Sequence, residues 1–334
     1  MRIALIGAGR VAGSHASALK AFPEHQITAF ADLNLDQARL MADEHGGQPF
    51  ADYRDLLAAG VSDAVVICVP HCLHREVAVA AFAAGQHVLL EKPMACSVDE
   101  CDEIIAAQQK SGRKLMIGYT HHFMPIIRKA RELVQGGRLG KLVLGTDLMS
   151  YGQVEPEAER KIKWLLRKDA AGGGTVMNNG SHAIGRLMFM TGQHVTSVYA
   201  ACGNERPDLT HIDVELHTFG LLHFSGGAVI SLWQDAYGQR DLNRNEFTGT
   251  EGAMTFPTYG GGIEFYHNRE KEDIPVEGPP AWQAEWAEFI GAIEEDRDPG
   301  INGYWGRRVV EIAQAMYLSS ELKKPVDLPS PLGL

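Results

Sequence analysis

The stretch that decides the fold is M-R-I-A-L-I-G-A-G-R-V-A at residues 1–12, an apolar run followed by a glycine-rich turn. The turn reads G-x-G-x-x-A, in which Gly7 allows a tight bend and Gly9 lets the backbone approach a pyrophosphate. Phosphates would lie at the N-terminus of the following helix, where free N–H groups favour an anion. An ordinary strand-to-helix turn is the alternative. We predict a dinucleotide site that includes Gly7, Ala8, Gly9, Arg10 and Val11.

Strand and helix patterns alternate through the first third of the chain. Near-continuously apolar runs, typical of parallel strands covered on both faces, occur at Ile3–Ile6, Ile27–Phe30, Ala64–Val69, His87–Leu90 and Leu115–Ile117. Helical stretches rich in Ala, Leu, Glu and Gln lie between them, at Val11–Phe22, Leu35–His45, Leu73–Ala84 and Val98–Ser111. This alternation predicts an α/β, doubly wound parallel sheet over residues 1–120.

A different pattern begins after about Gly118. Glycine clusters appear, and Val214–Phe224 alternates apolar even positions with mostly polar odd ones. A period of two indicates a sheet with one buried and one wet face. We therefore predict an α+β domain with an open, largely antiparallel sheet over residues 121–334.

Composition bounds the class of protein. The 334 residues are enough for about two domains. A hydrophobic fraction of 45% excludes general disorder, and a net charge of −11 is unfavourable for binding nucleic acid or anionic membranes. The five scattered cysteines suggest neither a disulfide framework nor a zinc ribbon, so we expect a cytoplasmic protein.

Asp32 follows the second expected strand. A carboxylate at this place can accept hydrogen bonds from an adenosine ribose diol and would repel a 2′-phosphate. The next residues, Leu33 and Asn34, offer no arginine for such a phosphate. The sequence therefore favours NAD over NADP, with a helix cap or a solvated acid as the alternative reading of Asp32.

Glu91-Lys92-Pro93 follows the strand at His87–Leu90. Lys92 is thus expected at the carboxyl end of a parallel strand, where ligands of open α/β sheets bind. Its ammonium could hydrogen-bond a substrate oxygen and stabilise developing negative charge. A surface lysine before a turn proline is the alternative.

The second chemical signal is G-G-G-T-V-M-N-N-G-S-H at residues 172–182. Asn178 and His182 lie four apart and would share one face of a helix. A histidine that titrates near neutrality suits the removal of an alcohol proton. Most of the 14 histidines are expected to have structural roles, so only the combination with Lys92 favours His182.

These motifs together resemble the Gfo/Idh/MocA family, which is named after glucose–fructose oxidoreductase, inositol dehydrogenase and a rhizopine-catabolism protein. The resemblance runs nearly end to end and includes Gly7-Ala8-Gly9, Glu91-Lys92-Pro93, the segment 172–182 and Gly249-Thr250-Glu251-Gly252. It implies an N-terminal Rossmann domain that binds NAD and a C-terminal domain that binds substrate. The open sheet of such proteins mediates oligomers, often tetramers. The implied reaction is hydride transfer at a CH–OH group of a sugar, sugar derivative or inositol.

The resemblance also assigns roles. It implies that Lys92 contacts substrate and cofactor, that Glu91 belongs to the cofactor site, and that His182 is the acid/base. It places Val69, Pro70 and His74 near the nicotinamide ribose. We further expect Asn179 in the substrate site, and Tyr151 and Trp164 as weaker candidates there, with core packing as their alternative.

The chain departs from the family pattern at two places. The family's usual aspartate four residues before the histidine is Asn178, which can orient His182 but carries no charge. Either His182 works with a less elevated pKa, or Lys92 takes more of the proton transfer. The family's frequent Arg-Phe pair reads His122-Phe123, preceded by His121. We expect His121 and His122 to touch the substrate region, with a domain-linker contact as an equal alternative.

Other readings stay open. A metal site made of Cys68, His71, Cys72 and His74 is disfavoured because no second cluster completes it, so we expect no metal. Two alternatives to the dehydrogenase are a glycosidase that recycles tightly bound NAD and an NAD-binding sensor without catalysis. The sequence does not identify the sugar or inositol.

Overall fold

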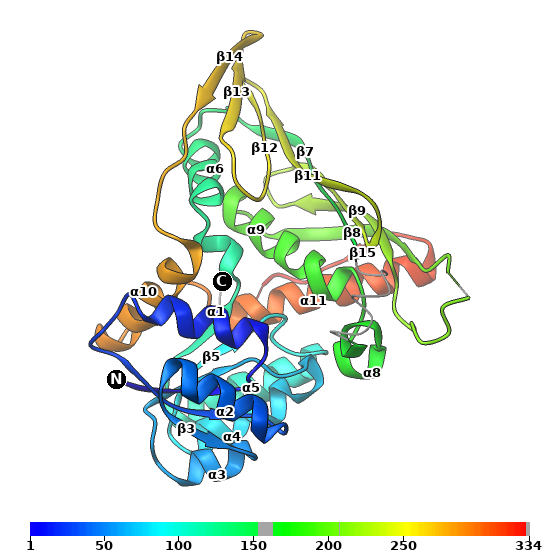
Figure 1. Ribbon diagram of the computed structural model, residues 1–334. Coiled ribbons are helices and arrows are strands. Elements are labelled where there is room, and N and C mark those ends of the chain that lie inside the picture. Colours follow the sequence, from blue (N-terminus) through cyan, green and yellow to red (C-terminus); the bar gives the residue numbers. More distant parts are fainter. Residues whose placement is uncertain (153–162, 207, 332–334) are drawn as a thin grey trace. The chain divides into compact units, whose positions relative to one another are not determined.

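A computed structural model describes residues 1–152, 163–206 and 208–331 (Figure 1). The chain forms two compact units, each with its own sheet. The first contains Met1–Thr120 and Pro280–Arg307, and the second contains His121–Pro279 and Arg308–Leu334. The segment Pro280–Arg307 thus packs with the first unit, although it follows most of the second unit in the chain. A division into domains 1–120 and 121–334 stays a prediction.

The first unit is built on a six-stranded parallel sheet, as the alternating pattern predicts. Its strands have the order β3-β2-β1-β4-β5-β6, and every neighbouring pair is parallel. They span β1 (Arg2–Ile6), β2 (Gln26–Ala31), β3 (Gln48–Phe50), β4 (Ala64–Ile67), β5 (His87–Glu91) and β6 (Leu115–Gly118). The order reverses between β1 and β4, so the carboxyl ends of these two strands open the crevice where such sheets bind ligands.

Helices cover both faces of this sheet. They are α1 (Arg10–Leu19), α2 (Leu35–His45), α3 (Tyr53–Ala58), α4 (His74–Ala83), α5 (Val98–Ser111) and α10 (Ala281–Glu294), with a 3₁₀ turn η1 (His71–Leu73). α1 packs against α2 and α10, while α4 packs against α5. Ser97 and Glu100 form a capping box at the start of α5, and Gly112 ends that helix in the left-handed conformation. Local sequence signals therefore set the limits of these helices.

The second unit is built on a nine-stranded sheet in the order β14-β13-β12-β11-β7-β10-β9-β8-β15. Its strands are β7 (Leu142–Gly152), β8 (Val195–Gly203), β9 (His217–Phe224), β10 (Val229–Asp235), β11 (Tyr237–Gly249), β12 (Ala253–Phe256), β13 (Ile263–His267), β14 (Glu270–Ile274) and β15 (Val326–Asp327). Among the described strands of this sheet, only β7 and β10 pair in parallel. The predicted open, largely antiparallel sheet is confirmed.

Helices cover one face of this sheet, and no helix of the described residues covers the other. The remaining elements are the 3₁₀ turns η2 (Thr120–Phe123) and η3 (Lys163–Leu166), the π-helix η4 (Val176–Gly180), and the α-helices α6 (Pro125–Gln135), α8 (Lys168–Ala171), α9 (Ser181–Thr191) and α11 (Gly303–Leu322). α9 and α11 run beside the central strands (Figure 1). On β9, Thr218, Leu222 and Phe224 face the covered side and are buried, whereas Phe219 is half exposed.

The strand expected over Val214–Phe224 begins only at His217. Val214 and Leu216 instead join an apolar cluster with Leu166, Ile212 and Ala236. Glu215 leaves the ladder because its carboxylate accepts hydrogen bonds from the backbone N–H groups of Gly174 and Val176. Within the described residues, no helix is both long and apolar enough to cross a membrane.

Candidate active site

The glycine-rich turn after β1 has a geometry that only small residues permit. Gly7 has a φ of +90°, and a Cβ there would lie 2.4 Å from the carbonyl oxygen of Cys68. Gly9 is different, because a Cβ at this position would have no atom of the described residues within 4 Å apart from its own chain neighbours. Gly7 is therefore required by the backbone conformation and by the close approach of Cys68. Gly9 instead leaves open space on the side of the turn where a ligand would approach.

The N-terminus of α1 fits an anionic group. Gly9 is its N-cap, and no side chain caps the helix there. The first N–H groups of α1 are therefore left to a partner such as a phosphate, and the helix dipole favours negative charge at this end. The exposed side chain of Arg10 begins the helix. The open cradle and the uncapped helix fit a dinucleotide pyrophosphate.

Asp32 stabilises the glycine-rich turn by hydrogen bonds to the backbone. Its Oδ2 accepts a hydrogen bond from the backbone N–H of Ala8 at 2.8 Å, and its Oδ1 accepts one from Asn34 at 2.8 Å. Gln37 adds a hydrogen bond from its side chain to the carbonyl oxygen of Ala8. Each carboxylate oxygen keeps a further lone pair, so Asp32 can hold the turn and still accept a ribose hydroxyl.

The ends of β4 and β5 are tied together by His74. Its ring is fully buried, with Nδ1 lying 2.9 Å from the carbonyl oxygen of Pro93 and Nε2 lying 3.0 Å from that of Val69. Burial lowers the pKa of His74. His74 therefore links the turn after β4, which includes Pro70, to the turn that carries Lys92.

Lys92 stands at the carboxyl end of β5 and is partly buried. Loss of water around the ammonium lowers its pKa to about 8, while the charge of Glu91 opposes this shift and that of Arg10 adds to it. A lysine with a pKa near 8 can exchange a proton close to neutral pH. Its position and its proton affinity both suit a substrate oxygen.

A buried acidic cluster lies behind Lys92. Glu91 accepts a hydrogen bond from His15 Nε2 at 3.0 Å, and its other oxygen accepts one from the backbone N–H of Lys92 at 3.2 Å. Glu285 on α10 accepts from the Thr120 hydroxyl, and burial followed by the charge of Glu91 raises the pKa of Glu285 well above its usual range. Sequence reasoning missed His15 and Glu285, since nothing local connects α1 and α10 with Glu91.

In the second unit, the glycine run places the backbone against Glu215. A Cβ on Gly174 would lie 2.0 Å from the Glu215 carbonyl oxygen, and one on Gly173 would lie 2.0 Å from the Tyr317 hydroxyl oxygen. The Glu215 carboxylate then binds two N–H groups of this segment and the Tyr317 hydroxyl. The expected helix over residues 178–182 begins as a π-helix and continues as α9, so it carries Asn178 and then His182. Single-turn π-helices are frequent at functional sites.

His182 stacks on His121. Their ring centroids lie 3.8 Å apart with an angle of 12° between the planes. His121 is in turn hydrogen-bonded to Arg186 and Tyr259, and Arg186 forms a fully buried ion pair with Asp147. The sequence prediction named His121 and His182 but gave no role to the other three residues.

The other predicted substrate residues have distinct surroundings. His122 is buried with its ring edge-on to Phe189 at 4.9 Å. Tyr151 packs against the apolar cluster and lies near Asn179, and burial raises its pKa above the usual range. Trp164 is partly buried in η3. None of these placements tests a role in substrate binding, so all remain predictions.

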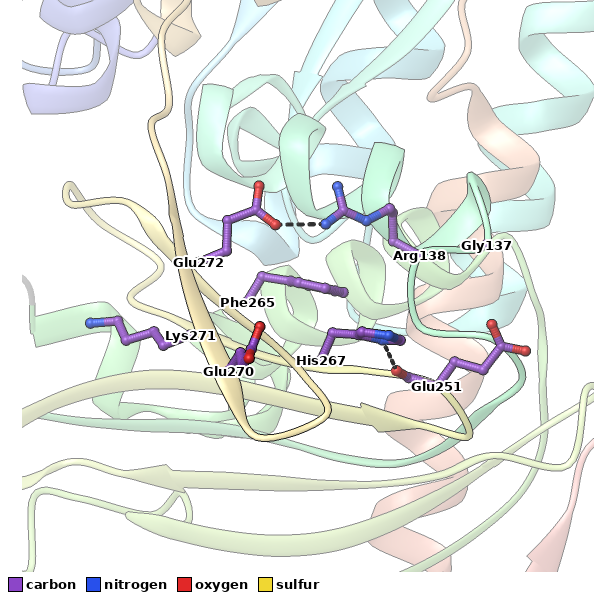
Figure 2. A pocket seen from close by; sticks show the side chains of 8 residues that line it. All are labelled: Gly137, Arg138, Glu251, Phe265, His267, Glu270, Lys271 and Glu272. Atoms are coloured by element: carbon purple, nitrogen blue, oxygen red, sulfur yellow. Dashed lines mark hydrogen bonds and ion pairs between the residues drawn. The ribbon is translucent and has the colours of Figure 1, made fainter.

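A separate pocket of about 500 Å³ lies against the β13–β14 hairpin (Figure 2). Two contacts join residues that line it. Arg138 pairs with Glu272 at 2.7 Å, and His267 Nδ1 donates to the Glu251 carbonyl oxygen at 2.7 Å. It contains none of the sequence-predicted catalytic residues. In the part of the chain that the structure describes, no three His, Cys, Asp or Glu side chains gather as metal ligands would.

Comparison with known proteins establishes the family. Residues 1–119 match the oxidoreductase family with the NAD-binding Rossmann fold, and residues 127–255 match the GFO/IDH/MocA C-terminal domain. The uncharacterized oxidoreductase YrbE of Bacillus subtilis (strain 168) is 31% identical, over 93% of this chain and 92% of that protein. This chain belongs to the Gfo/Idh/MocA family. The family resemblance drawn from the motifs is confirmed.

Other members of the family are similar over most of the chain. The D-glucoside 3-dehydrogenase of Escherichia coli (strain K12) is 28% identical over 78% of each chain. A crystal structure of an oxidoreductase domain protein from Kribbella flavida has a TM-score of 0.89 at 25% identity, and covers 98% of this chain and 99% of that one. Further Gfo/Idh/MocA relatives carry the names of sugar dehydrogenases and reductases. The first unit of this family member is thus an NAD(P)-binding Rossmann domain, and distant homologues act on sugars.

Proposed function

We propose that this chain is an NAD-dependent dehydrogenase that acts on a CH–OH group of a sugar, a sugar derivative or an inositol. The observation that carries the proposal is Lys92 at the carboxyl end of β5, with its pKa lowered to about 8, in the same unit as the dinucleotide turn. A D-glucoside dehydrogenase among the relatives supports a sugar as substrate.

The cofactor would be held by the residues around the first turn. Gly7, Ala8, Gly9, Arg10 and Val11 would surround the pyrophosphate, and the N–H groups at the start of α1 would bind its oxygens. Asp32 would accept hydrogen bonds from the adenosine ribose, which favours NAD over NADP. The ribose next to the nicotinamide would lie near Val69, Pro70, His74 and Glu91. When bound, the nicotinamide accepts or donates the hydride.

The chain's own residues would handle the proton and the charge on oxygen. Lys92 Nζ would donate a hydrogen bond to the substrate oxygen and stabilise its negative charge. A ring nitrogen of His182 would take up the hydroxyl proton during oxidation and return it during reduction. Asn178 would orient His182 by hydrogen bonding. His122, Tyr151, Trp164 and Asn179 would shape the substrate site directly, and His121 would act there through His182.

The test is NADH formation by the purified protein, with NAD and NADP supplied separately, across a panel of inositols, free sugars and glycosides. Turnover with NAD on one class of polyol is expected. Turnover of a glycoside without net NADH would replace the proposal with a glycosidase that recycles its cofactor. Binding of NADH with no turnover in either direction would replace it with a sensor. A cytoplasmic location is part of the same proposal.

A further inference from the structure

A buried ion pair fixes the position of one guanidinium next to His121. Asp147 on β7 and Arg186 on α9 are both fully buried. Asp147 Oδ2 lies 2.8 Å from Arg186 Nε and 2.5 Å from its second terminal nitrogen. Gln234 on β10 adds a long hydrogen bond to the other oxygen of Asp147. This pairing neutralises both charges and leaves the first terminal nitrogen of Arg186 to face His121.

The Arg186 guanidinium determines which ring nitrogen of His121 carries the proton. Arg186 Nη1 lies 3.0 Å from His121 Nδ1, and a guanidinium nitrogen can only donate. Nδ1 must therefore accept with its lone pair, which puts the ring proton on Nε2. That N–H points at the Tyr259 hydroxyl oxygen, 3.1 Å away. Protonation of Nδ1 would set an N–H against the guanidinium and would break this hydrogen bond.

His121 holds the ring of His182 face to face. The two rings are nearly parallel, 12° from coplanar, with centroids 3.8 Å apart. Arg186 and Tyr259 are hydrogen-bonded to the two ring nitrogens of His121. The ring therefore cannot rotate without breaking two hydrogen bonds.

We propose that His121 is a positioning residue for His182, in place of the carboxylate that Asn178 lacks. This inference rests on the proposed function, in which His182 takes up the substrate proton. His121 itself cannot serve as the base, because its one lone pair is occupied by Arg186. The groups that contact His121 include Arg186 and His182 from α9 and Tyr259 from the turn after β12, and Asp147 acts on it through Arg186.

The first test needs no substrate and uses NMR of the histidine rings in the full chain. The resonances of His121 are assigned by their loss in His121→Phe. We expect an unprotonated Nδ1 and a protonated Nε2 that do not titrate from about pH 5.5 to about pH 8.5. The ring protons of His182 should be shifted upfield by the stack in the wild type and in His121→Phe, but not in His121→Ala. The inference would be overturned if the His121 resonances titrated within this pH range. It would also be overturned if the chemical shifts of the His182 ring protons were the same in His121→Ala as in the wild type.

The second test separates positioning from binding and from chemistry. His121→Ala should lose about 10- to 100-fold in kcat with little change in KM. His121→Phe keeps a flat ring but loses both hydrogen bonds of the imidazole, so its loss in kcat should be clearly smaller than that of His121→Ala. Tyr259→Phe removes one hydrogen bond and should cost less than about threefold. Unfolding midpoints of all variants show whether each is folded.

Several outcomes contradict the inference. A His121→Ala enzyme with wild-type kcat shows that the stack has no role. Equal losses in His121→Phe and His121→Ala, in folded protein, show that the imidazole itself is needed, and a change in KM alone shows a substrate contact. A wild type without turnover on any compound refutes the proposed function, while the NMR test still decides whether His121 holds His182.

Discussion

At the scale of single residues, the pH dependence of the reaction tests the role of Lys92. If its ammonium must donate to the substrate oxygen, kcat/KM should fall as the pH rises through its pKa of about 8. Lys92→Arg keeps a positive charge at all accessible pH values. We therefore expect a rate lower by about 10- to 100-fold and no alkaline limb, whereas Lys92→Ala should lose about 100- to 1,000-fold.

The measurement is kcat/KM from about pH 6 to about pH 10, with NADH affinity measured separately by fluorescence. Affinity for NADH that stays close to wild type would show that the losses belong to the reaction rather than to cofactor binding. An alkaline limb near pH 8 that survives in Lys92→Arg would assign that limb to another group and remove the proton-donor role of Lys92.

Asn178 makes a second residue-scale prediction. Asn178→Asp places a carboxylate four residues before His182, on the π-helix that leads into α9. A nearby negative charge favours imidazolium, so the acidic limb of the kcat/KM profile should move to higher pH. Asn178→Ala should lower the rate without this shift. If rate and pH profile both match wild type in Asn178→Asp, then Asn178 does not orient His182.

At the scale of elements, two glycines of one turn should respond in opposite ways. Gly7→Ala forces a Cβ to 2.4 Å from the Cys68 carbonyl oxygen at a φ of +90°, so it should destabilise the first unit by about 2–4 kcal/mol. The Cβ of Gly9→Ala would have no atom of the described residues within 4 Å apart from its own chain neighbours, so stability should change by less than about 1 kcal/mol. Its methyl group would nevertheless occupy the space next to the helix N-terminus.

Urea unfolding and NADH titration of both variants test this contrast. We expect Gly9→Ala to weaken NADH binding by at least about tenfold while its unfolding midpoint stays near wild type. Unchanged NADH affinity in Gly9→Ala would show that the pyrophosphate does not lie against this turn.

The buried carboxyl of Glu285 links α10 to pH-dependent stability. Its pKa is raised in the folded chain, above the unfolded value of about 4.3. The stability that the neutral carboxyl contributes is complete below about pH 4 and is lost as the pH rises through the raised pKa. Glu285→Gln keeps this position neutral and can still accept from Thr120. The variant should therefore gain about 1 kcal/mol or more over wild type at alkaline pH.

Thermal unfolding at about pH 6 and about pH 8.5 tests the sign, because the advantage of Glu285→Gln should grow with pH. Glu288→Gln is the matched control on the same helix. It removes the Glu288–Arg297 ion pair nearer the surface, and its effect should be similar at both pH values. An advantage for Glu285→Gln that does not grow between these two pH values would mean that Glu285 is already ionised in the folded chain.

Helices and strands could be predicted where the sequence pattern itself repeats. They were harder to predict where contacts between distant parts of the chain determine the structure. The five apolar runs became β1, β2, β4, β5 and β6 because each strand is buried on both faces. The three-residue β3 is too short to produce a pattern. Residues 214–216 were predicted as strand because apolar and polar residues alternate there, but Val214 and Leu216 pack in a separate apolar cluster.

The candidate site divides in the same way. Residues in local motifs, such as Gly7, Lys92 and His182, could be selected from sequence. The partners that hold them could not, because His15, Glu285 and Arg186 lie far away in sequence and have no spacing rule. A buried Arg–Asp pair leaves no trace in the sequence pattern, since either residue alone reads as a surface charge.

At the scale of the whole molecule, the uncovered face of the second sheet should determine the oligomeric state. Leu144, Tyr199 and Phe219 are 53%, 42% and 51% exposed, and strand pairing puts them on one face together with Leu221 and Trp233. A contiguous apolar patch on a sheet is unfavourable in water and is typical of a contact between protein chains. Because family resemblance implies oligomers through this sheet, we predict that a second copy of the chain covers it.

The test is the mass in solution, measured by light scattering on a size-exclusion column. Phe219→Arg places a charge in the centre of the patch and should shift the wild-type dimer or tetramer to a smaller species, since an unpaired charge is costly to bury in an interface. Leu40→Arg is the matched control, because Leu40 is 59% exposed on α2 in the other unit and should leave the mass unchanged. A monomeric wild type would contradict the prediction directly. A Phe219→Arg variant with the wild-type mass would mean that the copies meet through a different surface.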